Sequence, residues 1–180
     1  NNGIIEQCYA TGSVSGINLV GGISGGISGQ SAIIRNCYTN CTVTVSSGPC
    51  AGIAAQASNG ASVINCYAIG AAVSPNWWAG VVAQSDGSLI ASGCFYNNQL
   101  VNSSLTGQGL TIEEMKKAGY YSAAGWDFAS EDANGTQQIW YMPADSLPIL
   151  CINNRQNTLF VFGSTEVPEN GAAQYKCSLI

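Results

Sequence analysis

The chain contains no histidine and few charged residues of either sign. Lys, Arg, Asp and Glu make up 8% of its 180 residues, against about 25% in an ordinary soluble domain. The five Lys and Arg residues are scattered, so the chain lacks the clustered cations that a nucleic-acid backbone requires. The absence of histidine removes a common general base and zinc ligand. We therefore expect no nucleic-acid partner, no metal, no cofactor and no enzymatic activity.

Long apolar runs are also missing. Residues 36–85 carry no charge, yet Gly, Asn, Ser, Thr, Gln and Pro interrupt them throughout. A transmembrane helix needs about 20 predominantly apolar residues in a row, so we expect no membrane insertion. Residues 1–99 hold only two carboxylates, Glu6 and Asp86, far apart in the chain. Because glycosidases need a convergent carboxylate pair, a carbohydrate-active enzyme is an unfavoured alternative.

Self-similarity at a period of 28 or 29 residues is the clearest pattern in the chain. The dipeptide Cys-Tyr occurs three times and is followed by one Cys-Phe, in steps of 29, 29 and 28 residues. These dipeptides are Cys8-Tyr9, Cys37-Tyr38, Cys66-Tyr67 and Cys94-Phe95. Glycines followed by small or branched residues recur halfway between them. The period and the lack of helical periodicity predict an all-β fold, a right-handed parallel β-solenoid of three to four coils.

Each repeat also predicts where its strands bend. An aliphatic or small residue stands three positions before each Cys, and an amide directly precedes the first three. Strand alternation would point the aliphatic residue and the Cys to opposite faces. Both reach the interior only if the chain turns at the amide, which tolerates left-handed geometry; the alternative is an inward Tyr and an outward Cys. Glu6 and Arg35 share one repeat position, so stacked coils would pair them.

A different pattern follows the repeats, which end near residue 99. The segment Thr111-Ile112-Glu113-Glu114 is a capping box that predicts a helix of about two turns, ended by Gly119. Gly125-Trp126-Asp127-Phe128 and Trp140-Tyr141 come next. Because the end of a solenoid exposes apolar side chains and strand edges, we expect residues 100–150 to cap that end with one short α-helix.

Residues 151–180 form a tail with a short apolar strand candidate. Its members are Leu159, Phe160, Val161 and Phe162. We expect this strand to pair with the cap, or to act as an assembly strand on a neighbouring molecule. Asn1 leads directly into repeat-like sequence, so the first coil is expected to present an unpaired edge to such a strand.

The repeat and cap phrases resemble those of GLUG-motif proteins, in which an Asn-Cys-Tyr strand is coupled to a Gly-Gly-aliphatic strand. The closest copy is Val20-Gly21-Gly22-Ile23-Ser24-Gly25, whereas residues 51–55 and 79–83 lack the final glycine. The resemblance covers about residues 4–99, and residues 111–150 are similar to the segment that closes such arrays. It implies a secreted or surface-displayed β-helical adhesin and no catalytic residue.

Eight cysteines favour an oxidising, extracytoplasmic compartment. Those of the repeat are expected to stack, where they can be small buried thiols. Outside the repeat, Cys41 with Cys50 and Cys151 with Cys177 would each close a loop, so we expect disulfides there. Sequons that would be used only in a eukaryotic secretory pathway begin at Asn40, Asn102 and Asn134. A chain rich in Asn, Ser and Thr also produces sequons by coincidence.

Trp77 and Trp78 are the strongest candidates for a binding surface. Pro75-Asn76 before them marks a loop. Neighbouring residues on a strand point opposite ways, so one ring is expected in the core and the other in solvent. An exposed Trp near the stacked Tyr38 and Tyr67 would suit a sugar ring or a protein, although stacked aromatics are also ordinary packing in solenoids.

These features predict a non-catalytic extracellular repeat domain that acts in adhesion or surface display, with a protein or glycan surface as its partner. The alternative is a structural subunit of an extracellular filament that self-associates head to tail by strand addition. An ice-binding face is less favoured, because Thr39, Thr42 and Thr44 have no counterparts in the other repeats.

Overall fold

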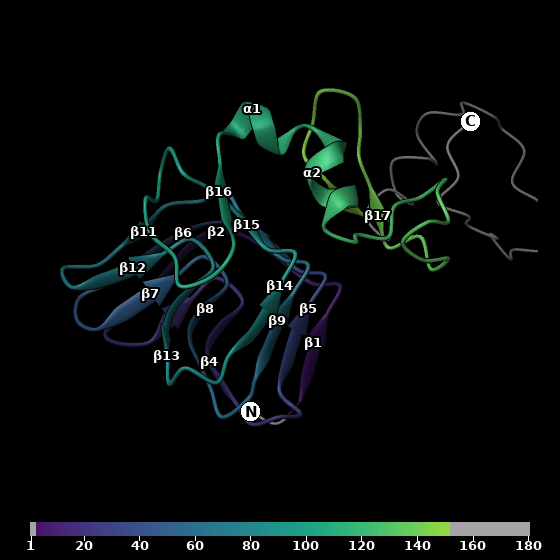
Figure 1. Ribbon diagram of the computed structural model, residues 1–180. Helices are drawn as coiled ribbons and strands as arrows, with labels where there is room; N and C mark the ends of the chain where they lie inside the picture. Colours follow the sequence, from purple (N-terminus) through teal and green to yellow (C-terminus); the bar gives the residue numbers. More distant parts are fainter. Residues whose placement is uncertain (1–2, 152–180) are drawn as a thin grey trace, which may run out of the picture.

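The computed structural model describes residues 3–151 and shows a parallel β-solenoid of three complete coils and part of a fourth (Figure 1). The first sheet holds β1 (Ile4–Glu6), β5 (Ile33–Arg35), β9 (Ser62–Ile64) and β14 (Ile90–Ser92). The second holds β2 (Tyr9–Gly16), β6 (Tyr38–Val45), β10 (Tyr67–Ala68), β11 (Ala72–Val73), β15 (Phe95–Asn97) and β16 (Gln108–Leu110). The third holds β3 (Val20–Gly21), β7 (Pro49–Ala51) and β12 (Trp77–Ala79), and the fourth β4 (Ser24–Ser28), β8 (Ala54–Ser58) and β13 (Val82–Ser85). The predicted fold class is confirmed.

The register of the second sheet follows the repeat found in the sequence. Tyr9 pairs with Tyr38, Tyr38 with Tyr67, and Tyr67 with Phe95. The three tyrosine rings stack with their centroids 5.1 and 5.0 Å apart. Such pairs contribute about 0.5–1.5 kcal/mol beyond the area they bury. We call these four residues the aromatic ladder.

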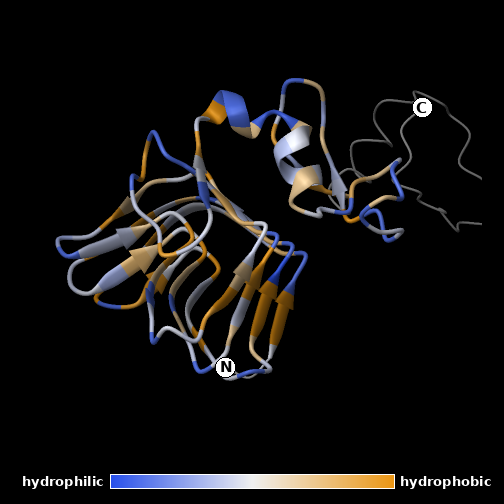
Figure 2. Ribbon diagram, viewed as in Figure 1, coloured by the Kyte–Doolittle hydropathy of each residue, from blue (hydrophilic) through white to orange (hydrophobic). Residues whose placement is uncertain are grey.

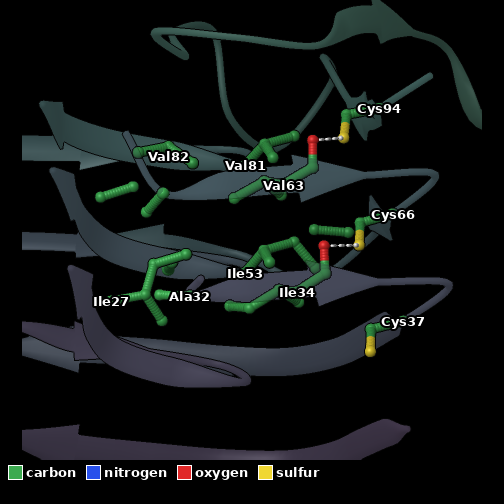
Figure 3. Close-up of a cluster of buried hydrophobic side chains, with 14 residues drawn as sticks. Ile27, Ala32, Ile34, Cys37, Ile53, Val63, Cys66, Val81, Val82 and Cys94 are labelled. Carbon is green, nitrogen blue, oxygen red and sulfur yellow. Dashed lines mark hydrogen bonds between the residues drawn. The ribbon is translucent and has the colours of Figure 1, made fainter. Parts of the chain in front are cut away.

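The chain turns at the residue before each repeat cysteine, as the sequence predicts. Gln7, Asn36, Asn65 and Gly93 take this place with φ of 50°, 52°, 50° and 60°. The turn allows Ile34 and Cys37 to be fully buried in the same core. Figure 3 shows the column of inward cysteines beside the aliphatic side chains. The ladder is therefore on the outer face of the second sheet, and the alternative of an inward Tyr is wrong.

The predicted ion pair between coils is confirmed. Glu6 and Arg35 are Cα partners in the first sheet, and Arg35 Nε donates to Glu6 Oε2 at 2.6 Å. Both side chains are 44% exposed, so the pair contributes only about 0.2–1 kcal/mol. Its main effect is to favour this register of β1 on β5.

Glycines in the middle of each repeat mark the places where neighbouring coils come closest. A Cβ added to Gly52 would lie 2.4 Å from both Ala68 Cβ and Gly80 O, and one added to Gly80 would lie 2.2 Å from Tyr96 Cγ. A Cβ on Gly22 would lie 2.2 Å from Gly52 O. These separations are far inside van der Waals contact, so only glycine fits.

The cap begins with two short helices instead of the single predicted one. α1 (Ile112–Met115) opens on the predicted capping box, in which Glu114 N–H donates to Thr111 Oγ1 and Thr111 N–H donates to Glu114 Oε2. Lys117 then adopts extended geometry, with φ −102° and ψ 114°, and α2 (Ala118–Ala123) starts after it. Gly119 therefore lies inside α2, and the expectation that it ends the helix is wrong.

The cap packs along the side of the solenoid, not over its end as predicted (Figure 1). Trp126 and Trp140 are fully buried in a cluster with Tyr67 and Phe95. Trp140 belongs to a hairpin of β17 (Trp140–Tyr141) and β18 (Ile149–Leu150). The outward ladder presents apolar rings that the coil interior does not cover, and the tryptophans bury them.

Three side-chain hydrogen bonds fix the position of the cap on the ladder. Trp126 Nε1 donates to the carbonyl of Gly93 at 2.8 Å, and Trp140 Nε1 donates to Asn36 Oδ1 at 3.4 Å. Tyr67 donates its hydroxyl to the carbonyl of Pro148 at 2.6 Å. Because Gly93, Asn36 and Tyr67 belong to the fourth, second and third coils, the cap spans most of the stack.

The end of the third coil is closed by the chain between the repeats and the cap. Gly80 N–H donates to Ser103 O at 2.8 Å, and Leu105 N–H donates to Val82 O at 3.0 Å. β16 then adds to β15 in parallel. Residues 97–110 thus do the end-capping that the sequence led us to expect of the helix and the tryptophans.

The predicted disulfide between Cys41 and Cys50 is absent, and both are free thiols. They are 1% and 0% exposed and pack in one apolar cluster with Val43 and Val45. Burial raises the pKa of both thiols, which keeps them protonated and poorly reactive. Cys177 lies outside the described residues, so its bridge to Cys151 stays a prediction.

A polar column links the turns of the first three coils. Asp86 accepts hydrogen bonds from the backbone N–H groups of Asn59 and Ser88, and Asn59 Nδ2 donates to Ser28 Oγ at 2.7 Å. The hydroxyl of Ser88 and these N–H groups lower the pKa of Asp86 from its ordinary value of 3.8 to about 2. The carboxylate therefore ties the turn of one coil to the turn below it.

This column predicts the acid response of the turns. Because the pKa of Asp86 is lowered on folding, its contribution to stability is present above the ordinary pKa and lost as pH falls through about 2. We expect an NMR titration of the Asp86 carboxyl in the folded chain to show a midpoint near 2. A midpoint at the ordinary 3.8 would contradict the hydrogen bonds to Asn59 and Ser88.

Candidate binding surface

The third coil carries an exposed tryptophan pair at the turn between the second and third sheets. β11 ends at Val73 and β12 begins at Trp77, and Ser74 orders the turn between them. Its Oγ accepts from the backbone N–H of Asn76 and Trp77 at 3.1 and 3.2 Å and donates to Gly48 O at 2.7 Å. The turn is therefore tied to the coil beneath it, which holds the tryptophans on a pre-organised support.

The two rings are buried to different extents. Trp77 is 62% exposed and Trp78 is 38% exposed. Trp78 takes the register position of Cys50, a core residue of the second coil, whereas Trp77 takes that of Pro49. Both rings are exposed, so the prediction that one of them would lie in the core is wrong. Val73 is 53% exposed on the other side of the turn, and we call Val73, Trp77 and Trp78 the tip surface.

The surroundings of the tip surface are neutral and polar. No charged residue occurs between positions 36 and 85. In the coil below, the backbone N–H groups of Ser46 and Ser47 donate to Gly16 O and Ile17 O at 3.1 and 2.8 Å. The turns are therefore stacked and hydrogen-bonded to one another. Exposed indole rings on a neutral, rigid base suit an uncharged sugar or protein surface more than a charged partner.

The tyrosines proposed as binding residues have a structural role instead. Tyr67 is 1% exposed and is covered by Trp126, Trp140 and Tyr121 of the cap. Burial raises the pKa of its phenol well above the ordinary value. Tyr38 is half-buried, with its ring stacked between Tyr9 and Tyr67. The prediction that Tyr67 binds a ligand is wrong, because the cap occupies its outer side.

Sequence reasoning did not predict that Val73 and Ile17 are exposed near these turns. Val14 and Val43 follow their repeat cysteines by six positions, whereas Val73 follows Cys66 by seven. Val43 pairs with Ala72, so the extra position turns Val73 to the outer face. Ile17 is 76% exposed on the turn of the first coil, and no pattern in the sequence distinguishes it from a core residue.

The sequon asparagines differ in accessibility. Asn40 on β6 and Asn102 after β15 are exposed. Asn134 is half-buried, and its Nδ2 donates to Ser122 O at 2.9 Å, so a glycan on this nitrogen would require the bond to break. The assembly strand predicted at residues 159–162 lies outside the described residues.

Other features of residues 3–151 add no second site of clear chemistry. A shallow pocket of about 570 Å³ beside α2 is lined mainly by apolar atoms, with Lys117 and Tyr120 among its residues. No three His, Cys, Asp or Glu side chains in this part of the chain are grouped to hold a metal ion. None of the described helices is long and apolar enough to cross a membrane.

Asp127 has a structural role in the cap. It is 7% exposed and accepts hydrogen bonds from the backbone N–H groups of Gln137 and Gln138 at 2.9 and 3.0 Å. Its carboxylate thereby orders the loop that leads into β17.

No family model, curated protein or solved structure matches the chain, so the resemblance to GLUG-motif repeats stays a prediction.

Proposed function

We propose that this chain is a non-catalytic extracellular domain that acts in adhesion or surface display, and that it contacts a protein or glycan surface through the tip surface. The observation that carries the proposal is the pair Trp77 and Trp78, exposed on a turn that is hydrogen-bonded to the coil below. The buried tryptophans Trp126 and Trp140 bind the cap to the ladder. One tryptophan pair, Trp126 and Trp140, is therefore buried and structural, whereas the other, Trp77 and Trp78, is exposed and available for contact.

Two further features support an adhesive role. The solenoid is a stack of short strands closed at one end by residues 97–110 and braced along its side by the cap, which suits a spacer that displays a fixed surface. The neutral surface around the tip suits contact with uncharged sugars. The resemblance of the repeats to surface-displayed adhesins points the same way, and with it we propose a secreted or cell-surface location.

The test is binding of the labelled full chain to arrays of glycans and of immobilised extracellular proteins. Trp77→Ala and Trp78→Ala together are expected to weaken binding to any positive spot by at least about 30-fold, because an interface tryptophan contributes 2 kcal/mol or more when it anchors a contact. Ile90→Ala is the matched control, since Ile90 is 58% exposed in the first sheet. Equal losses with both variants, or none with the tryptophan variant, would contradict the proposal.

A filament subunit is the second candidate, because the first coil leaves its strand edges open. Among the described strands, β1, β2, β3 and β4 each pair with one neighbour only, in the second coil. Under this hypothesis Leu159, Phe160, Val161 and Phe162 of one molecule add to that edge of the next. Negative-stain microscopy of the purified chain would show uniform fibres that are lost on Phe160→Asp and Phe162→Asp.

An ice-binding face has weaker support. Ser13 and Ser15 of the first coil pair with Thr42 and Thr44 of the second, and all four are exposed. In the third coil the partner of Thr44 is Val73. The hydroxyl rows therefore cover two coils, which is a small area for recognition of an extended lattice.

A further inference from the structure

We call the side of the first coil that points away from the second coil its lower face, and the coil on the side of β14 the upper one in each pair. The residues on the lower face are of the kind that elsewhere lie between two stacked coils. Tyr9 is 52% exposed and Ile4 is 55% exposed, whereas Tyr67 in the same ladder is 1% exposed. Figure 2 shows the apolar residues that run along β1 and β5 at this side of the stack. One ring face of Tyr9 stacks on Tyr38, and no described residue stacks on the other.

Two rows of backbone hydrogen bonds recur at the same repeat positions from coil to coil, whereas others, such as Gln7 N–H to Arg35 O, run from the lower coil to the upper one. Ile33, Ser62 and Ile90 donate their N–H groups to the carbonyls of Gly3, Ala32 and Ala61 at 3.1, 2.9 and 3.0 Å, and Tyr38, Tyr67 and Phe95 donate to those of Cys8, Cys37 and Cys66 at 3.1, 3.1 and 2.9 Å. In both of these rows the upper coil donates to the lower one. The equivalent donors of the first coil are the N–H groups of Ile4 and Tyr9, which face away from the second coil.

The repeat cysteines extend the pattern into the side chains. Each thiol of the upper three donates to the carbonyl of the aliphatic residue in the coil below. These contacts join Cys37 Sγ to Ile5 O at 3.7 Å, Cys66 Sγ to Ile34 O at 3.8 Å and Cys94 Sγ to Val63 O at 3.5 Å. Cys8 is exposed and donates to Glu6 O of its own coil at 3.2 Å, and no described carbonyl lies one coil lower. The acceptor that its counterparts find one coil lower is the missing part of the column.

The opposite end of the stack is partly covered, although β12 and β14 each pair with one described neighbour only. The N–H of Gly80 and the carbonyl of Val82 are bonded to Ser103 and Leu105, and β15 is covered by β16. A second copy of this chain therefore has no complete open coil to place beneath the first coil of its neighbour. A partner that satisfies the whole lower face must instead bring an open upper coil of its own.

We propose that the lower face of the first coil is a docking surface for one more parallel coil of the same 29-residue repeat. Such a coil carries an aliphatic carbonyl that accepts from Cys8, a corner amide, and an aromatic ring that stacks on Tyr9. A single added strand would meet one sheet edge, whereas a coil meets β1, β2, β3 and β4 together. The four open edges and the thiol thus select a coil over an isolated strand.

The experiment fuses a copy of residues 33–61, one 29-residue period, in front of Ile4 in the full chain, in place of residues 1–3. The control carries the same graft with Asn36→Pro and Tyr38→Asp in the grafted copy, because proline cannot adopt the corner φ of 52°. The readouts are the labelling rate of Cys8 with a thiol reagent, by peptide mapping, and hydrogen exchange at the amides of Ile4 and Tyr9.

With the intact graft, the labelling of Cys8 is expected to slow to the rate of buried Cys37 in the unmodified chain, and both amides gain protection. With the control graft, Cys8 keeps its original rate. Fast labelling of Cys8 beneath the intact graft would overturn the proposal. Two results with the unmodified chain would also overturn it. Protection of Cys8 that rises with protein concentration would indicate that a second copy covers the lower face. Protection of Cys8 that disappears when residues 152–180 are removed would indicate that the tail covers it.

Discussion

Trp140→Ala is expected to lower the free energy of unfolding by about 3–5 kcal/mol, the usual range for a fully buried tryptophan. Trp140 is 0% exposed and stands 4.3 Å from Trp126 between ring centroids. It also contacts Tyr38 and Tyr67 and donates to Asn36 Oδ1. Its loss leaves a cavity between the cap and the ladder and an amide oxygen without its donor. Urea unfolding measures the change.

The chain supplies its own control for this prediction. Trp77→Ala removes the same side chain from a site that is 62% exposed, and we expect a change within about 0.5 kcal/mol. The loss of the cap contact should also appear as faster hydrogen exchange at Tyr38 and Tyr67 in the Trp140 variant alone. Equal destabilisation by the two substitutions would show that the cap does not depend on the ladder.

Gly52→Ala is expected to destabilise the solenoid by about 1–3 kcal/mol or more through overpacking. The added Cβ would lie 2.4 Å from Ala68 Cβ and 2.4 Å from the carbonyl of Gly80. Ala68 and Gly80 both belong to the third coil, so relief requires the third coil to move away from the second. The measurement is the midpoint of urea unfolding at unchanged slope.

Gly26→Ala is the matched control, because a Cβ there would have its nearest atoms at 3.8 Å, an ordinary contact with Gln56. Gly26 lies in β4 of the first coil and is exposed. We expect this variant to unfold at nearly the midpoint of the unmodified chain. If Gly52→Ala were as well tolerated, the coils would not approach as closely as the glycine column indicates.

Local and repeated features of the fold were predictable from the sequence. The period fixes which residues stack, so the ladder and the pair of Glu6 with Arg35 follow from counting. The left-handed corner at Asn36 follows from the need to turn both Ile34 and Cys37 inward. These predictions rest on strand alternation and on backbone preferences, which act over a few residues.

The position of the cap was not predictable in the same way. Nothing in the spacing of Trp126 and Trp140 says whether they cover the coil end or the outer ladder, because that choice depends on contacts between distant segments. The ladder itself held a signal, since outward rings such as Tyr38 and Tyr67 require a cover. Once residues 97–110 close the end, the side of the stack is the apolar surface that remains for the cap.

The errors about single residues have related causes. Cys41 and Cys50 are close enough in sequence to suggest a bridge, but both pack in the core as free thiols. Gly119 was expected to end a helix that had already been broken at Lys117. Trp77 and Trp78 were predicted as a pair with one buried ring, and both stay exposed because the fourth coil has no strand above β12 in the described residues.

The most direct test of the account is chemical footprinting of the four tryptophans in the full chain, free and bound to a positive glycan or protein spot. We predict that an indole-oxidising reagent modifies Trp77 fastest and Trp78 next, leaves Trp126 and Trp140 intact, and loses its access to Trp77 and Trp78 on binding. Unchanged oxidation of Trp77 in the bound state would place the contact elsewhere. Oxidation of Trp126 and Trp140 at the rate of Trp77 would contradict the buried cap as well.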